Sequence, residues 1–476
     1  MKSEIVFVTP IILLSLAAVI LLLFNFFKNQ LLTMSFAIVS LIAAIATLSS
    51  SELTKIAFHG SIFTDGFSVV FQGIILVGTI ITVLLNSTSL ADQKVAPSVD
   101  VTALILFAAI GAMVMVSAAN LIVLFVGFEL LSVSVYALTG LARREKASAE
   151  AALKYFILGA FSSAFLLYGM TLVYAATGTL QINELAPKVL ENSGNIVMLV
   201  GLGLLIFGFC FKISAVPFHF WAPDVYQGAP ISITAFMAVV VKVAAFGSLL
   251  RVLGQSFISI DTVWVGFIWL LSIFTMTGGN IMAIRQTSPK RMLSYSSISH
   301  AGYALMGLVV LGQGGLNAVT FYLISYLFMT FTAFGVLLHV TAGSEHQYEK
   351  DTIESLRGLG WTHPLSAFIM TVAMLGLAGI PPLAGFIGKF YLFSAAVKGG
   401  FLGLAIIAAM NSVISLYYYL GIIVAMYFSG EKKSAWQPTA QISLPVFVAL
   451  ALTTTGTIYL GLFSGNCYTL LNWALH

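Results

Sequence analysis

Charge is scarce in this sequence. Lysine, arginine, aspartate and glutamate make up 8% of the 476 residues, whereas hydrophobic residues make up 59%. A soluble domain covers its surface with polar groups, and about a quarter of its residues are charged. The composition therefore excludes an ordinary soluble protein, and a formal net charge of +4 gives no reason to expect a nucleic-acid partner.

Cysteine and the common cofactor motifs are also missing. The two cysteines, Cys210 and Cys467, form no CxxC, so we expect no metal centre, cluster or disulfide framework. No GxGxxG stands at a strand–helix junction, and no phosphate loop is present. We therefore expect no nicotinamide, flavin, nucleotide or metal in this chain. If the protein serves a redox system, the electrons pass through other subunits.

Long apolar runs fill the sequence instead. Each is roughly 20 residues long, enough to cross ~30 Å of hydrocarbon as a helix. The runs are continuously apolar and do not alternate, which predicts helices and excludes a membrane barrel. The first run is too long for a signal peptide, so we expect a retained helix. About fourteen helices are predicted, near residues 5–26, 31–50, 64–87, 101–118, 120–140, 151–176, 195–214, 230–251, 262–283, 291–312, 315–341, 365–398, 401–428 and 440–465.

Lysine and arginine are distributed unevenly over the two sides that these helices define. Of the 21, twelve lie on one side, five lie on the other and four lie inside apolar runs. The positive-inside rule puts the twelve in the cytoplasm and both chain ends outside it, as an even number of helices requires. The twelve are Lys28, Lys94, Arg143, Arg144, Lys146, Arg285, Lys290, Arg291, Lys350, Arg357, Lys432 and Lys433; the five are Lys2, Lys55, Lys188, Arg251 and Lys398.

Two predicted helices contain proline. One reads FKISAVPFHFWAPDVYQGAP, with Pro217 near its middle, and the other reads LAGIPPLAGFIGKF, with Pro381 and Pro382. Proline removes a backbone donor and clashes with the preceding turn, so both helices should unwind locally. Paired interruptions of this kind in a transporter built from repeats indicate an ion path.

The two halves of the chain correspond to each other. Pro381 follows Pro217 by 164 positions. Lys389 follows Lys212 by 177. An offset near 170 spans five predicted helices, and because five is odd the second copy should be inverted. We therefore predict an all-α polytopic membrane protein with two inverted five-helix repeats, divided into residues 1–100 (helices 1–3), 101–260 (first repeat), 261–430 (second repeat) and 431–476 (helix 14).

Five ionisable residues lie inside the apolar runs. A charge near the bilayer centre costs at least ~2.5–3.5 kcal/mol, so such residues persist mainly when they have a function or a partner. One carboxylate cannot neutralise four ammonium groups, so some of the lysines must be neutral, hydrated or paired with another subunit. This mismatch indicates proton movement. The five are Glu129, Lys154, Lys212, Lys242 and Lys389.

Position along the helix distinguishes these candidates. Lys242 lies about twelve residues from each end of its run, where its side chain cannot easily reach water, and is the strongest relay candidate. Glu129 is about ten residues from either end and can pair with Lys212; a structural ion pair is the alternative. Lys212 and Lys154 lie nearer to helix ends, so extension of the side chain toward the interface competes with a relay role.

His300 and Lys389 are candidates in the second half. His300 lies in the serine-rich segment SYSSISHAGYAL, which suits hydration, although a buried histidine satisfied by its neighbours is the alternative. Lys389 follows the Pro381–Pro382 break by about two turns, and Gly385 and Gly388 leave room for water beside it.

Five segments of this sequence resemble the subunit N family of bacterial NADH–quinone oxidoreductase, respiratory complex I. They are GFELLSVSVYAL, FKISAVPFHFWAPDVYQGAP, VVKVAAFGSLLR, SPKRMLSYSSISHAGY and LAGIPPLAGFIGKFYLF. The resemblance is strong over residues 100–430 and weaker at the ends. Among the antiporter-like subunits, the string PDVYQGAP, a lysine at position 389 and the chain length favour this family.

The resemblance implies a proton-translocating subunit of an enzyme in the bacterial inner membrane, with a proton path along the membrane midplane. Other membrane subunits of complex I and the lipid bilayer would be its partners. NADH, FMN, iron–sulfur clusters and quinone would belong to those partners, with no redox centre in this chain. The matching residues are the Glu129–Lys212 pair, the modulating Lys154, the central Lys242, the connecting His300 and, near the exit, Lys389.

Two other functions remain open from the sequence. One is a subunit of a multisubunit sodium/proton antiporter, which has no electron donor. The other is a membrane scaffold that translocates nothing, although a scaffold has no reason to retain several buried lysines. The donor of a redox complex could also be ferredoxin or an F420-type carrier, because the donor binds other subunits.

Overall fold

The computed structural model describes residues 2–23, 29–49, 56–93, 98–142, 145–341, 351–428 and 442–475. Over these residues the chain is helical almost throughout; the described sheet is the hairpin of β1 (Ile56–Ala57) and β2 (Ile62–Phe63). Several basic residues used for the orientation lie outside the described residues: Lys28, Lys55, Lys94, Arg143, Arg144, Lys350, Lys432 and Lys433.

Twenty α-helices follow one another through the described part of the chain. The first half contains α1 (Lys2–Leu23), α2 (Gln30–Ala46), α3 (Gly66–Gln93), α4 (Ser98–Ser117), α5 (Leu121–Thr139), α6 (Lys146–Thr177), α7 (Ile182–Glu191), α8 (Ile196–Ile213), α9 (Trp221–Gly228), α10 (Ile231–Phe236) and α11 (Lys242–Arg251). The second half contains α12 (Asp261–Ile284), α13 (Pro289–Val309), α14 (Gly315–Thr341), α15 (Leu359–Thr362), α16 (Pro364–Ala378), α17 (Ala384–Lys398), α18 (Leu402–Phe428), α19 (Leu444–Leu462) and α20 (Ser464–Leu475).

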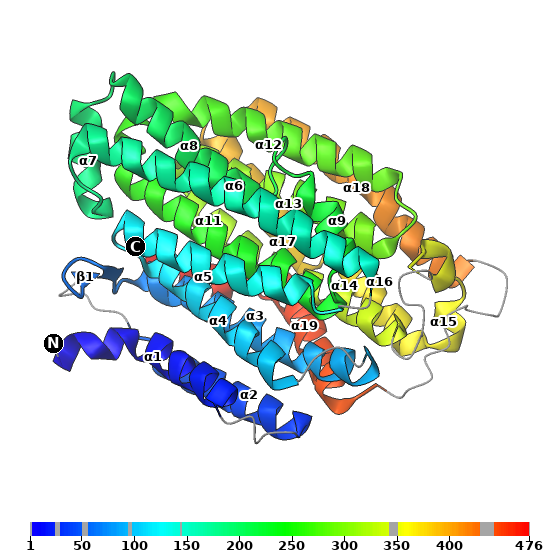
Figure 1. Ribbon diagram of the computed structural model, residues 1–476. Helices are drawn as coiled ribbons and strands as arrows, with labels where there is room; N and C mark the ends of the chain where they lie inside the picture. The colour runs from blue at the N-terminus through cyan, green and yellow to red at the C-terminus, as the bar shows by residue number, and fades with distance from the viewer. Residues whose placement is uncertain are drawn as a thin grey trace.

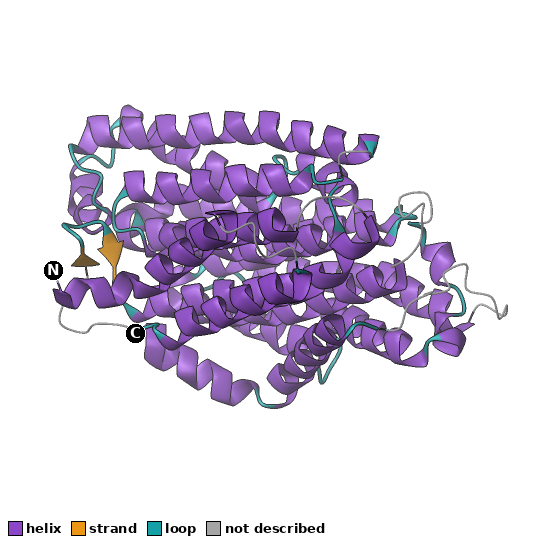
Figure 2. Cartoon of the chain, turned by 60° about the horizontal axis from the view of Figure 1, so that its bottom comes forward, coloured by secondary structure: helices purple, strands orange, loops and turns teal. Residues whose placement is uncertain are grey.

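The long helices lie side by side in one elongated bundle (Figures 1 and 2). Both chain ends lie at the same end of the bundle, near β1 and α7, and α15 lies at the opposite end (Figure 1). We call these the α7 end and the α15 end. Of the basic residues assigned to the cytoplasm, Arg357 lies two positions before α15.

The predicted all-α membrane fold is confirmed. Each of the fourteen predicted runs contains a helix, and eleven of the described helices are long and apolar enough to cross a membrane. The number of crossings and the domain boundaries stay predictions. Two runs differ in detail: 365–398 forms two helices, α16 and α17, and the run that starts at 230 continues to Ser256.

Both proline-containing segments are interrupted as expected. The first helix stops at Ile213 and resumes at Trp221, and Pro217 lies between. The second stops at Ala378 and resumes at Ala384, after the two prolines.

The centre of the bundle is the segment Ile231–Ser256, which is buried from Ile231 to Leu253. It consists of α10, a π turn (Met237–Val241), α11 and a second π turn (Val252–Ser256). A helix that is apolar on every side can be stable only when other helices surround it. The outer helices α12 and α18, by contrast, have only about a third of their spans buried within this chain, which leaves apolar faces for lipid or other chains.

Close packing between neighbouring helices depends on glycine at facing positions. A Cβ on Gly169 of α6 would lie 2.8 Å from the backbone oxygen of Gly201 of α8, and one on Gly302 of α13 would lie 2.5 Å from the backbone nitrogen of Met276 of α12. Small residues let membrane helices approach to backbone contact, where van der Waals packing holds them. These contacts fix α8 and α13, which carry Lys212 and His300.

Candidate functional site

Lys212 lies in the last turn of α8, with 1% of its surface exposed. Its Nζ donates a 2.7 Å hydrogen bond to Oγ of Ser132 on α5. Three aromatic rings surround the ammonium group: Phe128 at 4.9 Å, Tyr155 at 5.6 Å and Tyr136 at 5.7 Å from the ring centroids. Ring faces attract a cation. A hydroxyl and three rings thus hold Lys212, and no carboxylate among the described residues forms an ion pair with it.

Glu129 lies one turn before Ser132 on α5. Its Oε1 is buried and has no hydrogen-bond partner in the described part of the chain, while the residue as a whole is only half-buried. The carboxylate is near enough to Lys212 to act on it electrostatically, but the ammonium group bonds Ser132 and not Glu129. Glu129 and Lys212 are therefore neighbours, but their side chains form no direct ion pair in this structure.

Lys242 is the first residue of α11 and follows the π turn Met237–Val241 directly. Such turns are rare in helices and occur often at functional sites. The side chain is 2% exposed, and Nζ lies 2.6 Å from both the carbonyl oxygen and the hydroxyl oxygen of Ser297 on α13. Lys242 therefore has neutral oxygen partners within the described chain and no ion pair there.

His300 lies one turn beyond Ser297 on α13, between two tyrosines. Its Nδ1 lies 2.6 Å from the hydroxyl of Tyr322 on α14, and its Nε2 lies 3.1 Å from the hydroxyl of Tyr419 on α18. The Tyr419 hydroxyl also contacts Oγ of Ser296 at 2.5 Å. The imidazole is thus bonded on both sides by groups that can donate or accept a proton.

Lys389 lies on α17, just after the second break. Its Nζ donates to the carbonyls of Ala378 (2.9 Å) and Leu377 (3.2 Å), which are freed at the end of α16, and to Oγ of Ser412 (2.9 Å). The ring of Tyr303 lies 4.9 Å away. The last carbonyls of a helix carry partial negative charge and attract a cation. The proline break thus creates the binding position of Lys389.

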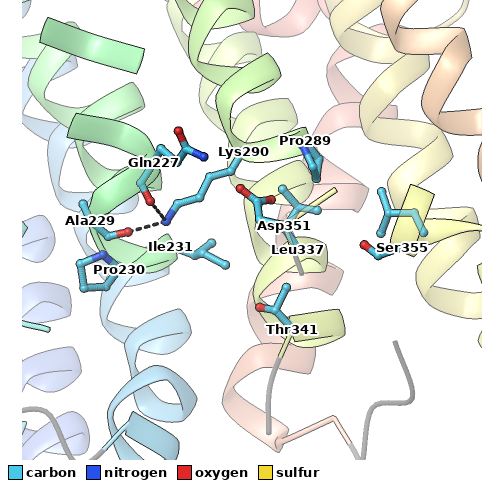
Figure 3. A pocket seen from close by; sticks show the side chains of 11 residues that line it. Gln227, Ala229, Pro230, Ile231, Pro289, Lys290, Leu337, Thr341, Asp351 and Ser355 are labelled. Atoms are coloured by element: carbon cyan, nitrogen blue, oxygen red, sulfur yellow. Dashed lines mark hydrogen bonds between the residues drawn. The ribbon is translucent and has the colours of Figure 1, made fainter. Parts of the chain in front are cut away.

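A cavity lies at the α15 end, beside the junction between α9 and α10 (Figure 3). It is partly open to solvent, and its volume of about 20 Å³ leaves room for about one water molecule. Residues that line it come from the end of α9, the start of α13, the end of α14 and the segment before α15; they include Gln227, Lys290, Thr341, Asp351 and Ser355.

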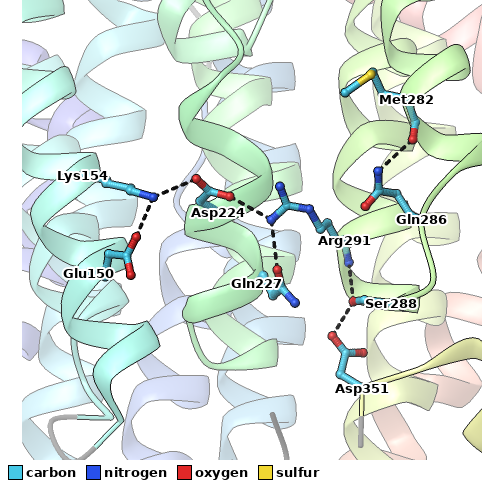
Figure 4. Close-up of polar contacts among 9 residues, drawn as sticks. All are labelled: Glu150, Lys154, Asp224, Gln227, Met282, Gln286, Ser288, Arg291 and Asp351. Atoms are coloured by element: carbon cyan, nitrogen blue, oxygen red, sulfur yellow. Dashed lines mark hydrogen bonds and ion pairs between the residues drawn. The ribbon is translucent and has the colours of Figure 1, made fainter. Parts of the chain in front are cut away.

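Lys154 lies apart from the other lysines. Its side chain is 41% exposed and pairs with Glu150 at 2.6 Å and Asp224 at 2.9 Å (Figure 4). Helix α6 begins at Lys146, before the predicted start, so Lys154 lies little more than two turns from the N-terminal end of this helix. The structure thus brings Lys154 to surface carboxylates and not to the Glu129–Lys212 neighbourhood; its modulating role stays a prediction.

Asp224 connects Lys154 to the second half of the chain. Its other oxygen accepts a 2.8 Å bond from Nη1 of Arg291, which also bonds Gln227 (Figure 4). Burial alone would raise the pKa of Asp224, but the hydrogen bonds from Lys154 and Arg291 outweigh it and hold the pKa below its ordinary value. The carboxylate therefore remains charged and fixes α9 between α6 and α13.

Arg251, which the charge distribution placed on the side opposite the cytoplasm at the end of the predicted run 230–251, forms an ion pair that the sequence did not predict. It ends α11, its side chain is 1% exposed, and its guanidinium binds both carboxylate oxygens of Asp65 at 2.7 and 2.9 Å. The rings of Phe63 and Phe67 lie 4.3 Å from it. A planar guanidinium suits this bidentate, ring-flanked position. The pair fixes the α7 end of the helix that carries Lys242.

Sequence reasoning missed several of these groups. Ser132, Ser412, Tyr322 and Tyr419 were not selected, although each contacts a candidate residue. Serine and tyrosine are common in membrane helices, so composition alone does not mark them. Within the described residues, no group of three or more His, Cys, Asp or Glu side chains is placed to hold a metal ion.

The fold and these residues define a polytopic helical membrane protein with ionisable groups on successive helices across its interior. Residues 118–415 match the family described as NADH:quinone oxidoreductase/Mrp antiporter, transmembrane. The chain is 41% identical to NADH-quinone oxidoreductase subunit N of Trichlorobacter lovleyi over 96% of this chain and 93% of that protein. It is 44% identical to subunit N 1 of Thermodesulfovibrio yellowstonii, over 85% and 86% of the two chains.

Solved structures agree with this assignment. A chain of respiratory complex I from Thermus thermophilus with bound aureothin is 34% identical, with a TM-score of 0.81 over 97% of this chain and 99% of that one. A chain of the archaeal membrane-bound sulfane sulfur reductase is 25% identical, with a TM-score of 0.85 over 98% and 96%. This chain belongs to the NADH:quinone oxidoreductase/Mrp antiporter family.

Proposed function

We propose that this chain is a proton-translocating membrane subunit of an NADH–quinone oxidoreductase. Protons move along Glu129, Lys212, Lys242, His300 and Lys389, through hydroxyl groups and internal water. NADH oxidation and quinone reduction take place in partner subunits, which carry the FMN and the iron–sulfur clusters. The chain itself contributes translocation, and we place it in the bacterial inner membrane with both ends outside the cytoplasm.

The observation that carries this proposal is the coordination of the three buried lysines. Lys212, Lys242 and Lys389 are bound by hydroxyls, carbonyls and rings, and none forms an ion pair with a described carboxylate. A buried ammonium group without a counter-ion costs several kcal/mol, whereas a neutral amine in the same position does not. Each lysine can therefore give up its proton to the next group when the local field changes.

The exposure of Glu129 supports a place in a larger assembly. A carboxylate open to lipid is costly, so we expect another membrane subunit to cover the face of α5 where Glu129 is only half-buried. A change in charge on that subunit would act first on Glu129 and then, across Ser132, on Lys212. Lys154 would influence the same region through Asp224 and α9.

Two alternatives are weaker. A sodium/proton antiporter subunit shares the fold, but the relatives at 41% and 44% identity bear the name of the oxidoreductase subunit. A scaffold without transport would not need lysines buried at 1–3% exposure among neutral partners.

The test is to purify the assembly through a tag on this chain and to reconstitute it in vesicles without sodium. We expect flavin and iron–sulfur absorption in the assembly, and NADH-driven acidification that does not require sodium. An assembly that lacks both cofactors and exchanges sodium for protons would show the antiporter alternative to be correct.

A further inference from the structure

Helix α18 carries two hydroxyl groups that contact the proposed path, although about two thirds of its span is not buried within this chain. Ser412 binds Lys389, and Tyr419, two turns further along α18, binds His300. Val413, directly after Ser412, is 67% exposed. A rotation of α18 by one residue position, about 100°, would therefore turn both hydroxyls away from their partners. The path thus depends on a contact that fixes the rotation of this helix.

A buried pair of asparagines joins α18 to α12, its neighbour along one side of the bundle (Figure 1). Asn280 of α12 is 0% exposed, and Asn411 of α18 is 3% exposed. Nδ2 of Asn280 donates to the backbone carbonyl of Asn411 at 3.0 Å and to its Oδ1 at 3.1 Å. Nδ2 of Asn411 donates to Oγ1 of Thr277 at 3.1 Å and to the carbonyl of Ile407 at 3.0 Å. Both side-chain amides therefore donate both of their hydrogens.

A tyrosine of α18 completes this contact. The hydroxyl of Tyr418 donates a 2.8 Å hydrogen bond to Oδ1 of Asn280. Asn411 and Tyr418 are seven positions apart, so they share one face of α18. Ser412 follows the first of them directly, and Tyr419 follows the second. Asn280 therefore binds α18 at two points about 10 Å apart along the helix, each next to a hydroxyl that contacts the path.

Helix α12 is itself fixed against the helix that carries His300. Gly279, next to Asn280, lies so close to α13 that a Cβ there would be 2.6 Å from the backbone nitrogen of Ser299. Ser299 directly precedes His300. Asn280 thus binds α18 at the level where the backbones of α12 and α13 meet beside the imidazole.

An asparagine pair fixes the rotation of a membrane helix more strictly than an apolar contact does. Lipid is as apolar as the helix surface, so membrane helices are held by close packing and by hydrogen bonds between them. If α18 rotated, both amides would lose their partners, and an unpaired buried amide is costly. A single buried asparagine specifies the register of coiled-coil helices for the same reason.

We propose that Asn280 is a positioning residue of proton translocation. By binding Asn411 it sets the rotation and depth of α18, and thereby keeps the hydroxyls of Ser412 and Tyr419 on the path. This inference rests on the proposed function and adds to it a residue outside the path itself. Loss of the Tyr418 hydroxyl alone leaves both donor bonds of Asn280 in place, so the asparagine pair is the principal contact.

The first experiment measures pumping by reconstituted complexes that carry changes in the pair. Asn280→Ala removes the bonds to Asn411 and Tyr418, and we expect NADH-driven acidification to fall by about fivefold. Asn411→Ala keeps the backbone carbonyl that Asn280 binds, so we expect a smaller loss. Ser272→Ala is the control, because buried Ser272 joins α12 to the carbonyl of Gly302 on α13 and not to α18. We expect it to pump at the natural rate.

The second experiment is a double-mutant cycle, which separates positioning of α18 from general packing. In a Tyr419→Phe complex, Asn280→Ala should lower pumping by only about twofold, because one of the hydroxyls that it positions is already absent. In a Glu129→Asp complex, the same change should keep its full effect, since Glu129 lies on α5 in the first half of the path. The subunit composition of each complex is recorded, and Asn411→Ala takes the place of Asn280→Ala in the cycle if the latter does not assemble.

Three results would overturn the positioning role. They are natural pumping by the assembled variants of the asparagine pair, an equal loss in Ser272→Ala, and an Asn280→Ala effect that Tyr419→Phe does not diminish or that Glu129→Asp diminishes equally. The natural complex is measured in the same vesicles. If it does not acidify them, the proposed function fails, whereas normal acidification there beside any of the three results rejects only the role of Asn280.

Discussion

The Nζ atom of Lys242 lies 2.6 Å from both the hydroxyl oxygen and the backbone carbonyl oxygen of Ser297. Ser297→Ala removes the hydroxyl and keeps the carbonyl, so the lysine stays in place and loses one acceptor. A hydrogen bond contributes about 1 kcal/mol, which corresponds to about fivefold in rate. We expect proton pumping to fall by about that factor, measured as the initial rate of dye quenching in vesicles with NADH present.

Ser299→Ala is the matched control for this prediction. Ser299 lies on the same helix and is equally buried, but its hydroxyl makes no hydrogen bond within the described chain. We expect wild-type pumping. An equal loss in both variants would mean that Ser297 acts only through packing of α13.

Tyr419 is expected to carry protons between Ser296 and His300. Tyr419→Phe keeps the ring and removes the hydroxyl that contacts both residues. We expect pumping to fall by about tenfold, which corresponds to about 1.4 kcal/mol on the barrier. The neighbouring Tyr418 bonds Asn280 and not His300, so Tyr418→Phe is the control. Similar losses in the two variants would refute a specific function for Tyr419.

Glu129 is expected to control the proton on Lys212 from a distance. Glu129→Ala should lower both pumping and the rate of NADH oxidation, because Lys212 loses the nearest negative charge. Glu129→Asp should retain part of both rates, since the carboxylate survives on a shorter side chain. The measurement is NADH oxidation followed together with acidification. Full coupled activity in a normally assembled Glu129→Ala complex would contradict this prediction.

The Asp65–Arg251 pair is expected to stabilise the α7 end of the bundle. Asp65→Ala leaves a guanidinium buried at 1% side-chain exposure without its counter-ion, which should cost on the order of 2–3 kcal/mol. The unfolding temperature of the detergent-solubilised chain should therefore fall. Lys188→Ala is the control, because its ion pair with Glu191 is exposed at 49% and 63% and should contribute little.

The same pair predicts the direction of an acid effect. Burial alone would raise the pKa of Asp65, but the hydrogen bonds and charge of Arg251 hold it below the ordinary value. Its stabilisation is therefore fully present above about pH 4 and is lost as the pH falls through the lowered folded value. The difference in unfolding temperature between the natural chain and Asp65→Asn should shrink on acidification. A difference that grows instead would contradict the assignment.

Much of the fold follows from the sequence because membrane helices obey simple rules of length and hydropathy. The two breaks were predicted from Pro217 and Pro381, since proline ends a helix for local reasons. The π turn before Lys242 was not predicted, because the segment Met237–Val241 is uniformly apolar and carries no local marker. The Asp65–Arg251 pair was not predicted, because the two residues lie 186 positions apart in the sequence.

The candidate site was predicted in part. Buried lysines are visible in a sequence because charge is rare in apolar runs, so Lys242 and Lys389 could be selected without a structure. Their partners could not be, because contacts such as Lys242–Ser297 and His300–Tyr419 join helices whose relative rotation no local pattern determines. Lys154 was grouped with the buried lysines because its contact with Asp224, which lies 70 positions away in the sequence, is not evident from hydropathy.

The proposed relay depends on whether Lys242 releases its proton. Lys242→Arg keeps a single positive charge but replaces the amine with a guanidinium, which does not lose its proton near neutral pH. The decisive measurement is NADH-driven acidification of vesicles that contain the Lys242→Arg complex, recorded beside NADH oxidation and the subunit composition of the complex. We predict a fully assembled complex that does not acidify the vesicles. Acidification at the rate of the natural complex would show that this lysine need not deprotonate and would contradict the relay.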